Sequence, residues 1–168
     1  GKVAVVTGGS RGIGLMIALG YVQNGAKVYI SSRKAEVCDA VAEELSKIGE
    51  CISIPADLSN KEGWETLVNG IKENEDSLDI LVNNAGVLET GTIETTSLAL
   101  WRHIQDVNTT STFLGCQAAV RAMKAGAVEL FEKPFSHQNL LNEIQRAIDD
   151  DAKNRESISE RLAILQRL

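Results

Sequence analysis

The sequence lacks the features that mark several classes of protein. No apolar run approaches the roughly 18–20 residues that cross a bilayer, and no signal peptide opens the chain. The three cysteines, Cys38, Cys51 and Cys116, form no Cys-x-x-Cys pair and no Cys/His cluster, which indicates reduced thiols and no metal site. A net charge of −6 provides no basic field for nucleic acid. We therefore expect a cytoplasmic protein without a metal, a membrane or a nucleic-acid partner.

Short apolar runs alternate with helical patterns along the 168 residues. Strands are predicted at residues 3–7, 27–31, 51–55, 79–83 and 127–131. Helices are predicted at residues 12–24, 34–48, 61–72, 97–123, 136–148 and 152–166. This alternation predicts an α/β fold with a five-stranded, doubly wound parallel sheet in three layers and an extra C-terminal helix. We expect one domain over residues 1–150, followed by an amphipathic helix over residues 151–168.

Apolar spacing indicates which side of each predicted helix meets the sheet. In helix 12–24, Ile13, Ile17 and Tyr21 share one side. In helix 61–72, the apolar side consists of Trp64, Leu67, Val68 and Ile71. We expect these residues to pack in the core.

A glycine-rich turn, Thr7 to Gly14, joins the first strand to the first helix. Gly8 permits a tight turn, Gly12 lets the backbone approach a pyrophosphate, and Gly14 allows the helix to pack closely on the strand. The N–H groups and the dipole at the start of the helix favour phosphate. The spacing G-x-x-x-G-x-G predicts a dinucleotide site formed by Gly8, Ser10, Arg11, Gly12, Ile13 and Gly14.

Three further motifs follow in order: Asp57-Leu58 after the third strand, Asn83-Asn84-Ala85-Gly86 after the fourth, and Asn108 in the long helix. Together with the glycine turn, they resemble the short-chain dehydrogenase/reductase family over about residues 1–122. The resemblance implies a Rossmann-like strand order, 3-2-1-4-5. It also implies that Asp57 and Leu58 line an adenine pocket and that Asn108 organises a proton-relay water as part of a catalytic tetrad. Beside the ribose it places Asn83, Ala85 and Gly86.

The end of the second strand predicts which dinucleotide binds. NAD enzymes usually carry an acidic residue there, which bonds the ribose hydroxyls. Here the strand ends in Ser31-Ser32-Arg33-Lys34, with no carboxylate. Ser32 and Arg33 are therefore predicted to contact a 2′-phosphate, since a guanidinium makes a forked contact with phosphate. NADP is expected rather than NAD, with Arg11 as a second basic contact; alternatively, Arg33 and Lys34 are a solvated start of the next helix.

The same resemblance implies residues that the sequence does not contain. The family places a catalytic Ser at the end of the fifth strand and a Tyr-x-x-x-Lys on the following helix. The two tyrosines, Tyr21 and Tyr29, are followed four positions later by Gly25 and Arg33. This predicts a protein that is not an enzyme: a scaffold that is at most a vestigial NADP-binding protein.

Residues from about 121 to 148, with Lys133-Pro134 at their centre, resemble the C-terminal part of a response-regulator receiver domain. In receivers this Lys contacts a phosphorylated Asp. The two resemblances together predict an engineered chimera that joins a dehydrogenase part, residues 1–122, to a receiver part, residues 123–150. Two alternatives stay open: an active NADP-dependent short-chain reductase, and a receiver-like dimerisation or signalling module. We expect a monomer or a weak homodimer.

Overall fold

The computed structural model describes residues 1–122 and residue 146, and these are the residues discussed below. Residues 1–122 belong to a unit that spans residues 1–126. Its strands are β1 (Val3–Thr7), β2 (Lys27–Ser31), β3 (Cys51–Ser53) and β4 (Ile80–Val82). Its helices are α1 (Gly12–Gln23), α2 (Ala35–Ser46), α3 (Lys61–Lys72), α4 (Leu98–Gln105) and α5 (Ser111–Ala122), with a π-helical segment η1 (Asp106–Thr110) between the last two.

The described strands form a parallel sheet in the order β3-β2-β1-β4. In the centre of the sheet, Val5 of β1 pairs with Tyr29 of β2 on one side and with Leu81 of β4 on the other. This confirms the predicted α/β class and the 3-2-1-4 part of the strand order. The predicted fifth strand, the helices after it, Lys133-Pro134 and the boundary at residue 150 lie outside the described residues.

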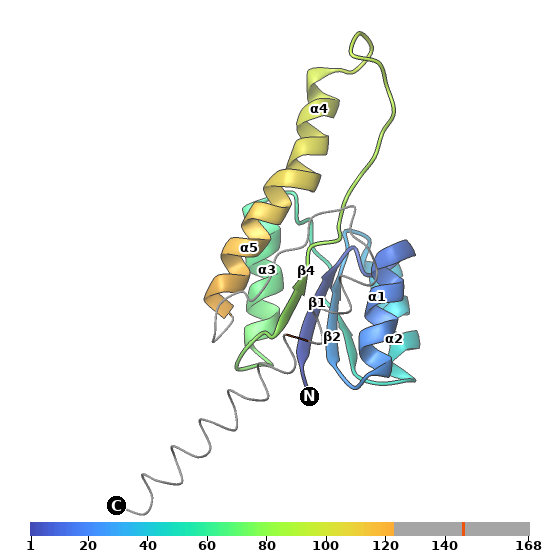
Figure 1. The fold of residues 1–168 in the computed structure, drawn as a ribbon, viewed down its shortest axis with the longest axis vertical. Helices are drawn as coiled ribbons and strands as arrows, with labels where there is room; N and C mark the ends of the chain where they lie inside the picture. The colour runs from blue at the N-terminus through green and yellow to red at the C-terminus, as the bar shows by residue number, and fades with distance from the viewer. Residues whose placement is uncertain (123–145, 147–168) are drawn as a thin grey trace, which may run out of the picture. The chain divides into compact units, whose positions relative to one another are not determined.

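Helices cover both faces of the sheet, with α1 and α2 on one face and α3 and α5 on the other (Figure 1). Successive side chains of β1 enter different cores because the strand is pleated. Val6 packs with Ala18 of α1, whereas Val5 packs with Trp64 and Leu67 of α3. The burial of β1 on both faces is typical of parallel sheets.

The side of α1 that meets the sheet is shifted from the predicted one, although Ile17 and Tyr21 are partly buried against the core as expected. Its buried residues are Gly14, Ala18 and Val22, whereas Ile13 is 59% exposed. Small residues on this side let the helix approach the strands closely, and the larger apolar residues lie at its edge. In α3 the prediction is confirmed for Trp64, Leu67 and Ile71.

The predicted long helix at 97–123 is interrupted by a change of helical type. It begins at Ser97, whose side chain accepts a hydrogen bond from the N–H of Leu100 at 3.1 Å. After α4 the backbone passes through η1 before α5 begins. The loop after β4 and α4 extend beyond the carboxyl ends of the strands (Figure 1). None of the helices in the described part is long and apolar enough to span a membrane.

A polar cluster ties β2 to the segment after α3. The hydroxyl of the fully buried Tyr29 donates to Oε1 of Glu75 at 2.7 Å, and Nζ of Lys27 lies 2.5 Å from the same oxygen. Burial raises the pKa of Glu75, but the hydrogen bonds from Lys27 and Tyr29 lower it more, so the pKa lies below its ordinary value. The folded state therefore favours the charged carboxylate.

Acid should weaken this cluster. A carboxyl group whose pKa is lowered in the folded state contributes stability above its unfolded pKa, near 4.5, and loses it as the pH falls through the folded pKa. We expect Glu75→Gln to lower the free energy of unfolding by about 1–2 kcal/mol at neutral pH. The difference from the wild type should shrink as the pH falls towards about 3. Urea unfolding across this range measures it.

Glu44→Gln is the control, because it removes an exposed ion pair between Glu44 of α2 and Lys47, the residue after the helix. It should keep the wild-type dependence on pH. A Glu75→Gln variant with the wild-type stability at every pH would contradict the stabilising role assigned to the Glu75 carboxylate.

Candidate functional site

Glycine is required at three positions of the turn between β1 and α1, at two for the backbone conformation and at one for lack of space. Gly8 and Gly12 have φ angles of +65° and +54°. A Cβ on Gly14 would lie 2.2 Å from the carbonyl oxygen of Gly8 and 2.5 Å from Nδ2 of Asn84. By contrast, a Cβ on Gly12 would meet no described atom within 4 Å. The turn is therefore closed on the side that faces the sheet and open on the side of Gly12.

The start of α1 faces this open side without a capping side chain. Arg11 occupies the N-cap position and makes no side-chain capping hydrogen bond, and the first turn of α1 contains no acidic residue. The first N–H groups of a helix have no partners within the helix. Here they are available to an anion, which the helix dipole also favours. Among the other predicted residues of the turn, Ser10 is buried, and Arg11 and Ile13 are exposed.

Thr7 connects the glycine turn to the segment after β4. Its Oγ1 accepts hydrogen bonds from the N–H groups of Asn84 at 2.9 Å and Ala85 at 3.0 Å, and it donates to the carbonyl of Val82 at 3.1 Å. Nδ2 of Asn84 donates to the carbonyl of Thr7 at 3.0 Å. Thr7 itself is 1% exposed, and its partners after β4 are partly buried. The two turns are held as one unit at the carboxyl edge of the sheet.

The adjacent asparagines have different surroundings. Asn84, which sequence reasoning did not select, contacts the glycine turn, whereas Asn83 lies against α5. Nδ2 of Asn83 is 3.7 Å from the sulfur of Cys116. Its Oδ1 is buried without a hydrogen-bond partner among the described residues. The threonine before Gly8 and the tandem asparagines were the signals that could have identified Thr7 and Asn84.

Asn108 lies in η1 and holds the loop that follows β4. Its Oδ1 accepts from the N–H of Val87 and its Nδ2 donates to the carbonyl of Val87, both at 2.8 Å. A Cβ on Gly86 would lie 3.4 Å from the same Oδ1. Single π-helical turns often occur at functional sites. The sequence placed Asn108 in an unbroken helix and did not predict this segment.

The end of β2 also adjoins the glycine turn. The N–H of Gly8 donates to the carbonyl of Ser31 at 2.8 Å. Ser32 is half-buried and Arg33 is exposed. The residues predicted to contact a 2′-phosphate, Ser32 and Arg33, therefore directly follow a residue that is hydrogen-bonded to the predicted phosphate turn.

Asp57 and Leu58 follow β3, the next strand in the sheet. Asp57 is exposed and accepts from the N–H of Ser59 at 3.1 Å, and Leu58 is buried. Burial raises the pKa of Asp57, but the hydrogen bonds from Ser59 and the charges of Arg33 and His103 lower it more. The net effect is a pKa below the ordinary value. The ends of β1, β2, β3 and β4 thus bring together the residues that the sequence motifs selected.

Comparison with protein families adds to this geometry. A family model described as short chain dehydrogenase matches residues 2–128. The chain is 42% identical, over 127 residues, to the rhamnolipids biosynthesis 3-oxoacyl-[acyl-carrier-protein] reductase of Pseudomonas aeruginosa. That match covers 76% of this chain and 50% of the relative. The chain is also 36% identical to the NADP-dependent (R)-specific alcohol dehydrogenase of Lentilactobacillus kefiri, and this match covers 74% of the chain and 49% of that relative.

Comparison with solved structures agrees with the family match. The complex of Pseudomonas aeruginosa RhlG with NADP at its active site matches with a TM-score of 0.71 and 42% identity. The match covers 76% of this chain and 50% of that chain. L-sorbose reductase from Gluconobacter frateurii, in complex with NADPH and L-sorbose, matches with a TM-score of 0.71 and 31% identity, covering 74% and 48%. The chain spans about half the length of the curated relatives it matches.

These relatives overturn the functional prediction from the sequence. They are named as reductases and dehydrogenases, so the prediction of a non-catalytic engineered scaffold is wrong. The prediction used the absence of Tyr-x-x-x-Lys as evidence. The resemblance places that motif beyond the matched half, so its absence here says nothing about activity. The family model also continues past the predicted join at residue 122.

Proposed function

The chain belongs to the short-chain dehydrogenase family, and on that premise we propose that it forms the NADP-binding part of an oxidoreductase. The reaction is hydride transfer between NADP(H) and a carbonyl compound or an alcohol, as the names of the relatives suggest for those proteins. The observation that carries the proposal is the glycine turn, which is closed towards the sheet at Gly14 and open at Gly12.

The residues of the turn fit a pyrophosphate. The open side of Gly12 leaves room for the phosphates, and the uncapped first turn of α1 directs N–H groups to them. Arg33 and Arg11 would neutralise the 2′-phosphate, and Asp57 and Leu58 would adjoin the adenine. Asn83, Ala85 and Gly86 would lie beside the ribose on the nicotinamide side. When bound, NADP(H) supplies or accepts the hydride.

The chain's own residues would orient the cofactor at the carboxyl edge of the sheet. Thr7 fixes the turn after β4 against the phosphate turn through three hydrogen bonds. Asn108 fixes the next part of that loop through Val87. Because these hydrogen bonds join the segment after β4 to β1 and to η1, they would hold the nicotinamide end of the site in place. The catalytic step belongs to the whole protein, since the matched half does not extend to the family's tyrosine motif.

The choice between NADP and NAD is tested at Arg33. We expect Arg33→Ala to weaken NADP⁺ binding by roughly 10- to 100-fold, because a charge-assisted contact with phosphate contributes about 1.5–3 kcal/mol. NAD⁺ lacks the 2′-phosphate, so its affinity should stay the same. Isothermal titration calorimetry measures both affinities.

Lys34→Ala is the matched control, since it removes the neighbouring exposed cation. It should weaken NADP⁺ binding by less than about 3-fold, as expected for a screened surface charge. Equal losses of NADP⁺ and NAD⁺ affinity in Arg33→Ala would contradict the role given to Arg33. In the whole protein, NADPH consumption that requires a carbonyl substrate tests the reaction, and consumption that is independent of any carbonyl would count against it.

A further inference from the structure

Trp64 hydrogen-bonds the turn that carries Asp57 and Leu58. It lies on α3, is 4% exposed, and donates from its indole Nε1 to the carbonyl oxygen of Leu58 at 3.0 Å. The bond is buried, so water cannot easily replace it. The indole N–H therefore fixes the backbone of a residue that the proposed function places beside the adenine.

The residue before Trp64 holds the same turn from another direction. A Cβ on Gly63 would lie 1.8 Å from the carbonyl oxygen of Asp57, so the first turn of α3 lies directly against this turn. The N–H of Gly63 donates to Oδ1 of Asn60, the N-cap of α3, at 2.9 Å. The backbone of Asp57 and Leu58 is thus positioned by α3 at two consecutive residues.

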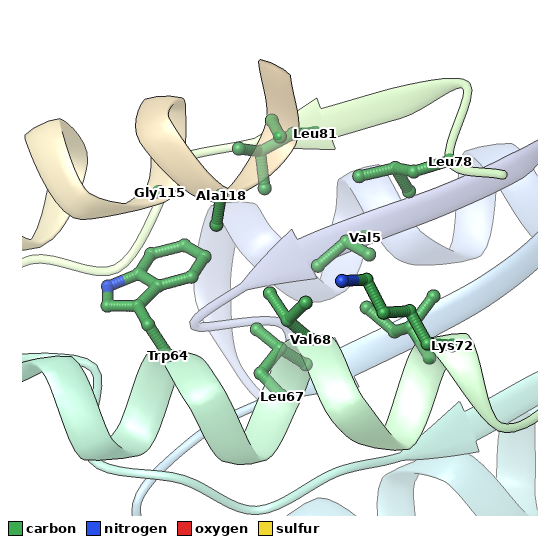
Figure 2. A pocket seen from close by; sticks show the side chains of 11 residues that line it. Val5, Trp64, Leu67, Val68, Lys72, Leu78, Leu81, Gly115 and Ala118 are labelled. Atoms are coloured by element: carbon green, nitrogen blue, oxygen red, sulfur yellow. The ribbon is translucent and has the colours of Figure 1, made fainter. Parts of the chain in front are cut away.

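The other edge of the Trp64 ring lies against α5. Figure 2 shows the ring beside Gly115 and Ala118, at one end of an apolar pocket between α3, α5 and the sheet. A Cβ on Gly115 would lie 2.5 Å from Cη2 of Trp64 and 2.5 Å from Oδ1 of Asn83. Gly115 is therefore the place where the ring and the first asparagine after β4 both reach α5.

We propose that Trp64 is a positioning residue for the dinucleotide: it sets the position of the Asp57–Leu58 turn relative to α5 and Asn83. The inference rests on the proposed function, because it takes Asp57 and Leu58 as the adenine side of the site. Trp64 itself does not touch the cofactor. It acts through the carbonyl of Leu58 at one end of the ring and through Gly115 at the other.

The first test compares binding in variants of similar stability. Trp64→Phe keeps an aromatic ring but removes the N–H donor. Adenosine 2′-phosphate, which engages only the adenine side, should bind about 3- to 10-fold more weakly to this variant, as expected for the loss of one buried hydrogen bond. Ile71→Val, in the same apolar cluster of α3, is the control. It should lower stability without changing the affinity of the fragment.

The second test uses the fluorescence of the native Trp64. The chain has two tryptophans, and Trp101 is 54% exposed on α4. In Trp101→Phe, the remaining tryptophan emission comes from Trp64 alone. Titration with adenosine 2′-phosphate should change this emission and saturate at the concentration that calorimetry gives. Gly115→Ala, which places a methyl group against the ring, should weaken the fragment's binding in the same direction as Trp64→Phe.

Two results would overturn the inference while leaving the proposed function intact. One is a folded Trp64→Phe that binds adenosine 2′-phosphate as tightly as the wild type. The other is saturable binding to Trp101→Phe with no change in emission, a result that does not depend on whether Trp64→Phe folds. If the wild type binds neither NADP⁺ nor the fragment, the proposed function itself fails and the inference with it.

Discussion

Gly14→Ala should abolish NADP⁺ binding and lower the free energy of unfolding by about 1–3 kcal/mol. The added Cβ would lie 2.2 Å from the carbonyl oxygen of Gly8, which is a backbone atom and cannot rotate away. To admit the methyl group, α1 must move away from β1. That movement would displace the N–H groups at the start of the helix from the phosphate position. Urea unfolding and calorimetric titration measure the two effects.

The same helix provides a matched control. A Cβ on Gly20 would meet no described atom within 4 Å. Gly20→Ala should therefore be neutral, or stabilise the protein by up to about 1 kcal/mol, because alanine favours helix more than glycine does. Its NADP⁺ affinity should equal that of the wild type. If Gly14→Ala behaved like Gly20→Ala, the close approach of α1 to β1 would not govern the site.

Thr7→Val should have the second large effect. Valine keeps the shape of threonine but removes the hydroxyl that accepts from the N–H groups of Asn84 and Ala85 and donates to Val82. These partly buried groups would lose a partner, at a cost of about 1–3 kcal/mol in the free energy of unfolding. The turn after β4 would also lose its attachment to the glycine turn, so NADP⁺ affinity should fall by about 10-fold. Thermal unfolding and calorimetry follow both quantities.

Thr7→Ser separates the hydroxyl from the methyl group. It keeps all three hydrogen bonds and should cost only about 1 kcal/mol, with NADP⁺ affinity close to the wild type. If Thr7→Val and Thr7→Ser were equally stable, the hydroxyl would not be what joins the two turns.

The class of the fold could be predicted from the sequence, because it depends on the local alternation of strand and helix patterns. The order of the described strands was predicted only through the resemblance to the dehydrogenase family, since strand order depends on pairing between distant segments. The glycine spacing predicts the turn between β1 and α1, because each glycine is required by the local backbone conformation or by close packing. Apolar spacing also predicts the core side of α3, where Trp64, Leu67 and Ile71 are large and distinct from their neighbours.

Features that depend on contacts between distant segments could not be predicted. The buried side of α1 consists of small residues, and hydrophobic spacing therefore selected Ile13, which is exposed. Asn84 bonds to Thr7, which is 77 positions earlier in the chain, and Asn108 bonds to Val87 across 21 positions. Nothing in the sequence near Asp106–Thr110 predicts a π-helical segment. The functional prediction was wrong because it treated the absence of Tyr-x-x-x-Lys as evidence against activity. The chain matches only about half the length of its relatives, and the resemblance places that motif beyond the matched half.

Calorimetric titration of the chain with NADP⁺, with NAD⁺ as the reference ligand, is the decisive measurement of whether the chain forms an NADP site. We expect saturable binding of NADP⁺ that is at least about 10-fold tighter than that of NAD⁺, because only NADP⁺ engages Arg33 through a 2′-phosphate. A chain that binds NAD⁺ as tightly as NADP⁺, or that binds neither dinucleotide, would contradict it.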